Sequence, residues 1–186
     1  MLAQRLRDSG RDVILTREPG GSTGAEEIRK LLVEGEPGRW SAETEVLLFT
    51  AARRDHVERR IRPALDAGKI VLCDRYWDST RAYQGSGALR SKVEELHYLM
   101  IGLLPDMTLI FDMDPNDGLA RAGKRATAGE DRFESKGLAF QQRLRATYLE
   151  IAAAEPQRCS VIDAAQSVES VAQQVLKQVL ARLENS

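Results

Sequence analysis

A short apolar run near the middle of the chain ends abruptly in groups that could do chemistry. Residues 70–73 are Ile-Val-Leu-Cys, a composition typical of a strand covered on both faces of a parallel sheet. Asp74, Arg75 and Tyr76 follow at once and supply a carboxylate, a guanidinium and a phenol. Open α/β sheets bind ligands beyond the carboxyl ends of their strands, so a carboxylate here can lie near a metal and an arginine near an anion.

The same charged pair has a simpler interpretation. An Asp–Arg pair at the end of a strand is often an ion pair in solvent, worth under about 1 kcal/mol. Side chains that can form hydrogen bonds follow closely and favour the functional interpretation: Ser79, Thr80, Tyr83 and Gln84.

The composition narrows the class of protein. The chain has 186 residues, enough for a single domain over 1–186 with a substantial core. A net charge of -1 and a pI near 6.2 give no global basic field, which argues against nucleic acid or a membrane surface as a partner. No apolar run approaches the ~18 residues of a membrane span, and the amino end has no apolar signal segment, so we expect a cytoplasmic protein. Cys73 and Cys159 are expected to be buried, and neither lies at metal-ligand spacing from His56 or His97.

Strands and helices alternate along the chain, which predicts a parallel sheet with helices on both faces. A Ser/Thr-x-x-Glu pattern predicts capping boxes at Thr23 and Ser91, and Ser41 is expected to cap a third helix. The expected strands cover residues 12–16, 70–73, 107–114 and 160–163. The expected helices cover residues 1–10, 41–68, 91–104, 137–154 and 167–183, and two further helices are expected to begin at Thr23 and Pro115.

Four motifs give the chain a family resemblance. They are TREPGG at 16–21, LFTAAR at 48–53, DRY at 74–76 followed by STRAYQG at 79–85, and DRFE at 131–134. In this order they resemble the bacterial thymidylate kinases, over essentially the whole chain. Each motif alone is weak, but the succession is specific. The resemblance implies an α/β fold, the three-layer P-loop kinase fold with a parallel sheet.

The resemblance also implies a P-loop, G-x-x-x-x-G-K-[ST], and this pattern does not occur in the sequence. The nearest match, residues 118–124, is followed by Arg125 where Ser or Thr should stand, and we interpret it as coincidence. By comparison with the family, we expect roughly 20 residues to be missing before Met1, including the first, central strand and the P-loop. We therefore expect the native protein to be longer. A chain without that segment would leave strands unpaired and could not hold the phosphates of ATP.

By resemblance, the protein transfers the γ-phosphoryl group of ATP to dTMP and gives dTDP for dTTP synthesis. Such a transfer is mostly positioning and neutralisation of charge. The dTMP phosphate is already largely a dianion at neutral pH because its second pKa is about 6, so no general base is needed. Mg²⁺ would arrive with ATP and keep most of its water ligands. A homodimer is implied by the family alone.

The resemblance assigns roles to individual residues. Asp74 matches the carboxylate beside magnesium, and Glu18 resembles a residue near both the acceptor and the metal. Phe49 matches the ring that stacks on thymine, a contact worth ~1–3 kcal/mol where measured for bases. The candidate cations at the acceptor phosphate are Arg17, Arg29, Arg53 and Arg75, of which Arg53 and Arg75 match the family most directly.

Three more residues are expected to contact the acceptor nucleotide. Gln84 carries both a donor and an acceptor, which suits a pyrimidine edge. Thr80 matches another family contact, and Tyr83 resembles the tyrosine beside the sugar, where a ribose hydroxyl would crowd it. Simpler interpretations stay open: Arg29 as a surface arginine and Phe49 as a core phenylalanine.

A basic segment over 121–134 resembles the lid of the family. Its cations, expected to bind ATP, are Arg121, Lys124, Arg125 and Arg132. Bacterial members supply from the lid an arginine that stabilises the transferring phosphoryl group, and we assign this role to Arg121 and Arg125, with Asp74 and Arg75 as further catalytic residues. A solvated basic loop is the alternative.

Two other functions stay open. A deoxynucleoside kinase shares the strand-end Asp-Arg arrangement but needs a carboxylate base for its neutral hydroxyl acceptor. A non-catalytic descendant could bind dTMP without ATP, and the missing P-loop motivates that alternative.

Overall fold

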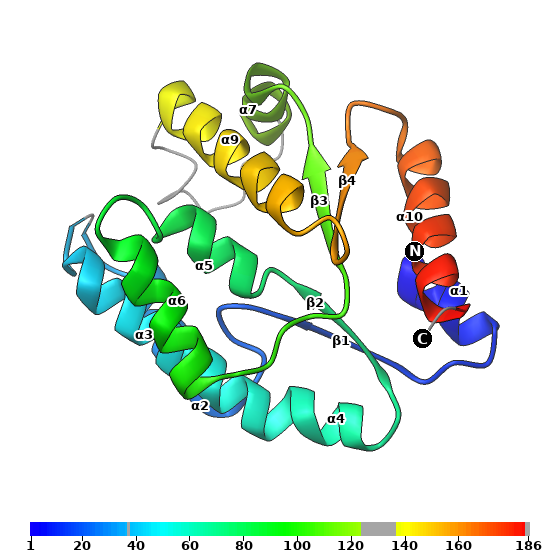
Figure 1. Ribbon diagram of the computed structural model, residues 1–186, viewed down its shortest axis with the longest axis horizontal. Helices are drawn as coiled ribbons and strands as arrows, with labels where there is room; N and C mark the ends of the chain where they lie inside the picture. The colour runs from blue at the N-terminus through cyan, green and yellow to red at the C-terminus, as the bar shows by residue number, and fades with distance from the viewer. Residues whose placement is uncertain (37, 124–136, 185–186) are drawn as a thin grey trace. The chain divides into compact units, whose positions relative to one another are not determined.

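The computed structural model describes residues 1–36, 38–123 and 137–184 (Figure 1). The chain divides into two compact units, residues 3–104 and residues 105–186 with 1–2, and each unit is described by itself. The elements, in chain order, are α1 (Leu2–Asp8), β1 (Val13–Arg17), α2 (Thr23–Val33), α3 (Ala42–His56), a π-helical turn (Val57–Ile61), α4 (Arg62–Asp66), β2 (Ile70–Asp74), α5 (Trp77–Tyr83), α6 (Leu89–Met100), β3 (Thr108–Asp112), α7 (Pro115–Gly123), α9 (Leu138–Ala154), β4 (Cys159–Asp163) and α10 (Val168–Glu184).

In the unit of residues 3–104, β1 and β2 pair in parallel, from Val13 opposite Ile70 to Arg17 opposite Asp74. This register brings the two charged strand ends to the same edge of the pair. The ladder continues one residue further, because the backbone N–H of Glu18 donates to the carbonyl oxygen of Asp74 at 2.9 Å. The segment after β1 and the segment after β2 therefore start side by side.

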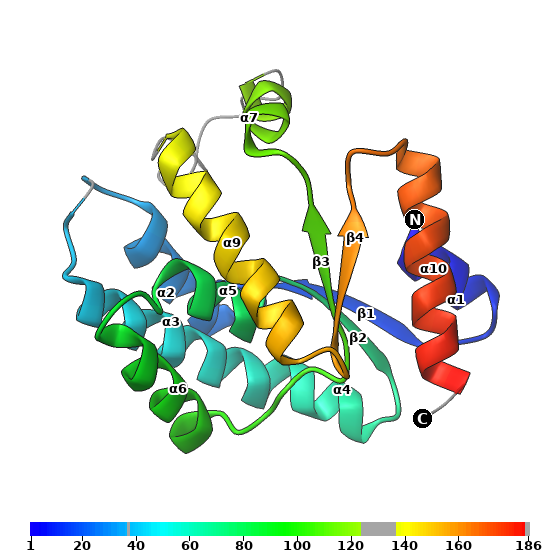
Figure 2. The same cartoon turned by 45° about the horizontal axis from the view of Figure 1, so that its top comes forward.

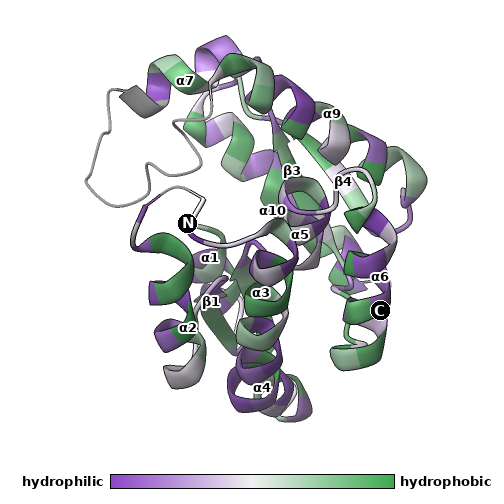
Figure 3. Ribbon diagram, turned by 90° about the vertical axis from the view of Figure 1, so that its left-hand side faces the viewer, coloured by the Kyte–Doolittle hydropathy of each residue, from purple (hydrophilic) through white to green (hydrophobic). Residues whose placement is uncertain are grey.

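A long helical stretch supports this pair. Ser41 caps α3 as expected, its hydroxyl accepting from the backbone N–H of Thr44 at 3.2 Å. The helix then passes through one π-helical turn at Val57–Ile61 and continues as α4, so the expected helix over 41–68 is confirmed. Figure 3 shows hydrophobic and hydrophilic residues sharing α2, and Ala25 and Leu32 are its buried residues.

Both predicted capping boxes are wrong. The cap position of α2 is Ser22, one residue before Thr23, and no side chain of its own segment caps it. Asp55 of α3 takes that role, because its Oδ2 accepts from the backbone N–H of Ala25 at 3.1 Å. Helix α6 begins at Leu89, before Ser91. The pattern at Thr23 could not predict the first result, because the partner of an orphan N–H group can come from a distant helix.

Two clusters form the core of this unit. Val46, Trp77 and Val93 join α3, α5 and α6, and Val57, Ile61 and Ile101 join the π-helical turn to the end of α6. Helix α5 was not predicted from the sequence. Its residues Trp77 and Thr80 are buried, so the short helix carries both a core side chain and a candidate site side chain.

In the unit of residues 105–186, β3 and β4 pair in parallel, from Thr108 opposite Cys159 to Asp112 opposite Asp163. Figures 1 and 2 both show α9 on one side of this pair and α10 on the other. Asp112 ends β3 and forms a two-pronged ion pair with Arg145 of α9, with N···O distances of 2.6 and 2.8 Å.

The strands form two parallel pairs rather than one sheet over the described residues. This confirms an α/β fold with parallel strands. The expectation that residues 70–73 are covered on both faces is wrong, because all four are half-buried. Of the two cysteines expected to be buried, Cys159 is buried and Cys73 is only half-buried. Leu15, Phe111 and Val161 are exposed strand residues. The face of a strand is buried only where helices pack on it, and these strand positions are left partly open.

The single domain over 1–186 stays a prediction beside this division into two units. None of the described helices is long and apolar enough to cross a membrane.

Candidate functional site

A buried network of polar side chains joins the ends of β1, α3 and α5. Arg53 of α3 donates from Nε to Oε2 of Glu18 at 2.8 Å and from Nη2 to Oγ1 of Thr80 at 2.8 Å. The residues Glu18, Arg53 and Thr80 are 7%, 3% and 3% exposed. A buried guanidinium is tolerated when it is paired and hydrogen-bonded, and here both conditions hold. Three residues expected to bind the substrate are therefore brought together by direct contacts.

The Arg53 guanidinium still has donors to offer. Its carbon lies 5.0 Å from the centroid of the Tyr76 ring, a cation–π contact that covers one side of the plane. Within the described part of the chain, Nη1 of Arg53 makes no hydrogen bond. An arginine carries five N–H donors, so this one is oriented by two of them and keeps others for a ligand.

The loop after β1 is tied down by two arginines. Nη1 of Arg17 and Nη1 of Arg29 both donate to the carbonyl oxygen of Pro19, at 2.9 and 3.0 Å. Arg17 also pairs with Glu26 at 3.2 Å, and Glu26 accepts from the backbone N–H of Gly21 at 2.8 Å. That bond from Gly21 lowers the pKa of the Glu26 carboxyl below its ordinary value, and the charge of Arg17 lowers it further. Arg17 and Arg29, both candidate anion binders, thus shape the loop as well.

Asp74 and Arg75 are both exposed at the carboxyl end of β2. Arg75 has φ of 62°, in the left-handed region that a residue with a Cβ seldom adopts. The carbonyl of Arg75 accepts from Sγ of Cys73 at 3.0 Å, and its guanidinium lies 5.4 Å from the ring centroid of Tyr83. Backbone strain of this kind clusters at functional sites, which supports a role for Arg75.

Burial keeps two neighbouring groups neutral. Desolvation, with the charge of Glu18 as the next cause, raises the pKa of the Tyr76 phenol well above its ordinary value. The same causes raise the pKa of the Cys73 thiol. Tyr76 therefore stays protonated and donates to the carbonyl oxygen of Leu103 at 3.1 Å, which holds its ring under Arg53.

The remaining candidates lie on the same elements. Phe49 is half-buried on α3, one turn before Arg53 and so on the same face of the helix. Gln84 is 6% exposed and follows α5, its backbone N–H donating to the carbonyl of Thr80 at 2.9 Å. Tyr83, half-buried, ends α5.

In the other unit, Arg121 is an exposed residue of α7. It donates from Nη1 to the carbonyl oxygen of Ala164 at 3.0 Å, in the loop after β4. The same loop is fixed by Asp163, which accepts from the backbone N–H of Ala165 at 2.9 Å. Hydrogen bonds from Gln166, first, and from Ala165 lower the pKa of the Asp163 carboxyl. The other expected lid cations, Lys124, Arg125 and Arg132, lie outside the described residues.

The carboxylates expected beside magnesium differ in what they can offer. The two oxygens of Glu18 are each within hydrogen-bonding distance of a side chain, Arg53 at Oε2 and His56 at Oε1. Asp74 instead presents an exposed carboxylate at the strand end, which suits a cation that keeps most of its waters. Among the residues that the structure describes, no group of three or more His, Cys, Asp or Glu is placed to hold a metal ion.

Sequence reasoning missed His56. It follows Arg53 by three positions, so the two side chains share one face of α3. Its Nδ1 lies 3.1 Å from Oε1 of Glu18 and its Nε2 lies 2.6 Å from Oγ1 of Thr16. The signal that could have found it is its position three residues after Arg53, which places both side chains on one helix face. Metal-ligand spacing could not find it, because His56 does not have that spacing.

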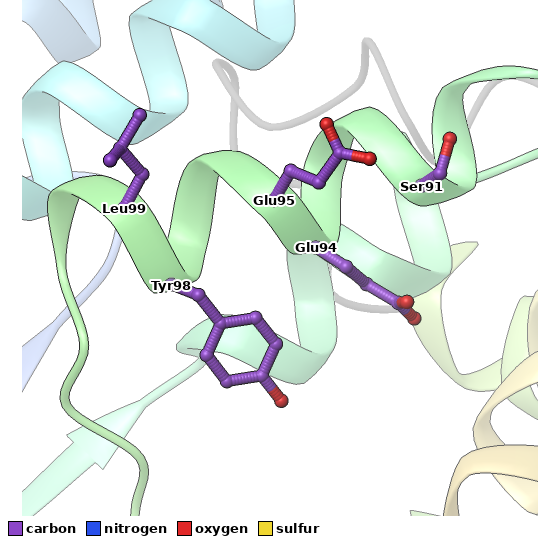
Figure 4. Close-up of a pocket in the computed structure, with 5 residues that line it drawn as sticks. All are labelled: Ser91, Glu94, Glu95, Tyr98 and Leu99. Carbon is purple, nitrogen blue, oxygen red and sulfur yellow. The ribbon is translucent and has the colours of Figure 1, made fainter.

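A separate pocket lies on α6 and shares no residue with this network (Figure 4). It is lined by Ser91, Glu94, Glu95, Tyr98 and Leu99. Tyr98 and Leu99 are 63% and 76% exposed.

Comparisons with known proteins agree on one family. The family model described as Thymidylate kinase matches residues 1–175. The thymidylate kinase of Ruegeria pomeroyi is 57% identical over 185 residues, which cover 98% of this chain and 87% of that protein. The thymidylate kinase of Dinoroseobacter shibae is 59% identical over 177 residues, 94% of this chain and 85% of that protein. The crystal structure of thymidylate kinase from Ehrlichia chaffeensis is similar with a TM-score of 0.74 at 32% identity, over 96% of this chain and 87% of that chain.

These matches confirm the resemblance. They do not bear out the expectation that the P-loop is lacking, and the absence of a first strand is not confirmed either.

Proposed function

This chain belongs to the thymidylate kinase family, and we propose that it transfers the γ-phosphoryl group of ATP to dTMP. Homologues that bear this name at 57% and 59% identity support the activity. The observation in the molecule that carries the proposal is the buried Arg53 guanidinium. Glu18 and Thr80 hold it by two hydrogen bonds at the carboxyl ends of the strands, and it keeps donors for a ligand.

The acceptor is bound by cations and a ring. Arg53 and Arg75 offer guanidinium groups to the nucleotide, and Phe49 offers a flat apolar face one helical turn from Arg53. Thr80 of α5 and Gln84, the residue directly after α5, supply polar contacts. This division between an apolar face and a few fixed polar groups is typical of small-molecule sites.

The chemical step needs positioning more than proton transfer. The dTMP phosphate attacks as a dianion, so no residue has to remove a proton. Arg75, with Arg17 and Arg29 around the loop after β1, lowers the repulsion between two anionic substrates. Arg121 and Arg125 are proposed to stabilise the transferring group, with Lys124 and Arg132 on the phosphates of ATP.

Magnesium, when bound with ATP, neutralises charge on the phosphate oxygens. We assign Asp74 to it because that carboxylate is exposed at the end of β2. Glu18 stays a second candidate, although its two oxygens already face Arg53 and His56.

The proposal also covers the cellular location of the protein and its oligomeric state. We place the protein in the cytoplasm, as expected from its sequence. We also propose a homodimer, for which the exposed apolar residues Tyr98, Leu99 and Met100 at the end of α6 offer a surface. Light scattering of the wild type and of Leu99→Glu tests it: a monomeric wild type contradicts the homodimer, and a Leu99→Glu variant that stays dimeric rules out this surface.

A coupled assay of ADP release with dTMP, and with thymidine as the control acceptor, tests the activity. We expect turnover with dTMP and none with thymidine. Turnover with thymidine alone would identify a deoxynucleoside kinase. Calorimetric binding of dTMP without any binding of ATP-magnesium would identify a non-catalytic binding protein.

A further inference from the structure

His56 is the buried end of the network that holds Arg53. It ends α3 and its side chain is 0% exposed. One ring nitrogen faces Glu18, the other faces Thr16, and both partners belong to the β1 strand or the loop directly after it. The ring therefore bridges two residues that come from a single short stretch of chain.

The hydrogen bonds assign the tautomer of this ring. A Glu18 carboxylate paired with Arg53 can only accept, so Nδ1 of His56 must be the donor. Nε2 of the neutral ring then accepts the hydroxyl proton of Thr16 across 2.6 Å. Both nitrogens are satisfied without a charge on the imidazole.

This arrangement fixes the plane of the Glu18 carboxylate. Oε2 holds Nε of Arg53 at 2.8 Å, and a single such bond would leave the carboxylate free to turn about its last torsion. His56 holds the other oxygen at 3.1 Å and removes that freedom. The direction in which Arg53 points is thus set by Thr80 on one side and by Glu18 with His56 behind it on the other.

The ring also limits where the loop after β1 can lie. A Cβ on Gly21, whose φ is +91°, would sit 2.3 Å from Nε2 of His56 and 2.5 Å from Oγ1 of Thr16. The backbone of Gly21 therefore rests directly on the His56–Thr16 hydrogen bond. Only glycine fits there, because any side chain would meet the imidazole as well as an unfavourable φ.

We propose that His56 is a positioning residue for the acceptor nucleotide: it acts through Glu18 to aim the Arg53 guanidinium at dTMP. The inference rests on the proposed function, because Arg53 must be a ligand of dTMP for its direction to matter. His56 itself touches neither substrate. Its loss should weaken binding of dTMP far more than binding of ATP, since Asp74, the residue assigned first to the magnesium of ATP, is exposed at the end of β2, whereas the hydrogen bonds of His56 reach Glu18 and Thr16.

The test is calorimetric binding of dTMP to the full chain, with KM for dTMP and for ATP measured beside it. In His56→Leu we expect the Kd for dTMP to rise about tenfold, the scale of one weakened hydrogen bond to a charged group. KM for ATP should stay within about twofold of the wild type. His56→Gln, whose amide can donate to Glu18, should recover part of the affinity.

A double-mutant cycle separates positioning from general packing. If His56 acts through Glu18, the His56→Leu change should have little further effect on dTMP affinity in a Glu18→Gln background. Simple addition of the two effects contradicts the proposal. His97→Leu is the control for the loss of a buried imidazole, since His97 is 1% exposed, stacks on Trp77 and meets the ring of Tyr76 edge-on. An equal loss of dTMP affinity in that control overturns the proposal.

Thr16→Val replaces His56→Leu if the latter does not fold. It keeps the shape of the residue and removes only the hydroxyl that holds Nε2, and we expect about a threefold or larger loss of dTMP affinity. An unchanged affinity in this variant, or in a folded His56→Leu, refutes the role of His56. A wild type that binds no dTMP refutes the proposed function itself, and the inference with it.

Discussion

Asp55 and Ser22 are joined by a hydrogen bond of 2.6 Å although they lie 33 positions apart in the chain. The same carboxylate oxygen accepts the backbone N–H of Ala25, so α3 caps the first turn of α2. Two consecutive residues of α3, Asp55 and His56, therefore both hold the segment that follows β1. Helices α2 and α3 are therefore fixed to each other and to the segment after β1, which carries Glu18 of the candidate site.

Asp55→Ala should lower the free energy of unfolding by about 1–2 kcal/mol, because the amino end of α2 loses its only capping side chain among the described residues. Urea denaturation measures the change. Arg59→Ala is the control, since Arg59 pairs with Asp55 at 3.9 Å from a side chain that is 75% exposed, and should cost under about 0.5 kcal/mol. Equal losses in the two variants would mean that the ion pair, and not the cap, stabilises the contact.

Arg53→Lys should weaken dTMP binding at least about tenfold. An ammonium group cannot meet Glu18 and Thr80 in the fixed geometry of a guanidinium and still present donors to a ligand. Arg54→Lys is the matched control, because Arg54 is the next residue, is half-exposed and pairs with Glu58 on the surface. Calorimetry with dTMP measures both. A normal affinity in Arg53→Lys would remove Arg53 from the site.

Arg75 permits a test that separates backbone strain from the guanidinium. At its φ of 62°, Arg75→Gly should be more stable to urea than Arg75→Ala by about 1 kcal/mol, because glycine adopts the left-handed region without a steric cost. Both variants should lose activity with dTMP to the same extent, since both lack the guanidinium. A glycine variant that keeps full activity would show that Arg75 serves the backbone alone.

Glu26 should make stability depend on acid pH. The pKa of its carboxyl is lowered in the folded protein, chiefly by the hydrogen bond from Gly21. A lowered pKa contributes stability above the ordinary carboxyl value of 4.5 and loses it as the pH falls through the folded value. The difference in urea midpoint between wild type and Glu26→Gln should therefore shrink between about pH 6 and pH 3. A difference that stays constant over this range would contradict a lowered pKa of the Glu26 carboxyl.

The thiol of Cys73 should react slowly with disulfide reagents in the folded protein. Burial raises the pKa of its thiol, and the thiolate is the reactive form, so a disulfide reagent at about pH 8 should modify it at least about tenfold more slowly than free cysteine. A Cys159→Ser background isolates the reaction. Urea should restore the rate of free cysteine, and a fast reaction in the folded protein would contradict the raised pKa of this thiol.

The strands, the cap of α3 and the family could be predicted from the sequence, because each depends on residues that are neighbours in the chain. The apolar runs predicted four strands, and the structure has β1, β2, β3 and β4 at those places within one or two residues of each end. Ser41 capped its helix as expected. The succession of motifs predicted the family, which the comparisons confirm.

The sequence by itself determined the elements, the family and the set of candidate residues, because periodicity and motifs depend on neighbours in the chain. Only the tertiary structure decided which partner each polar group meets. Ser22, and not Thr23, precedes α2, and its cap comes from Asp55. His56 became part of the site because the register of β1 and the face of α3 bring Thr16, Glu18 and Arg53 to one buried point, where every polar group must find a partner.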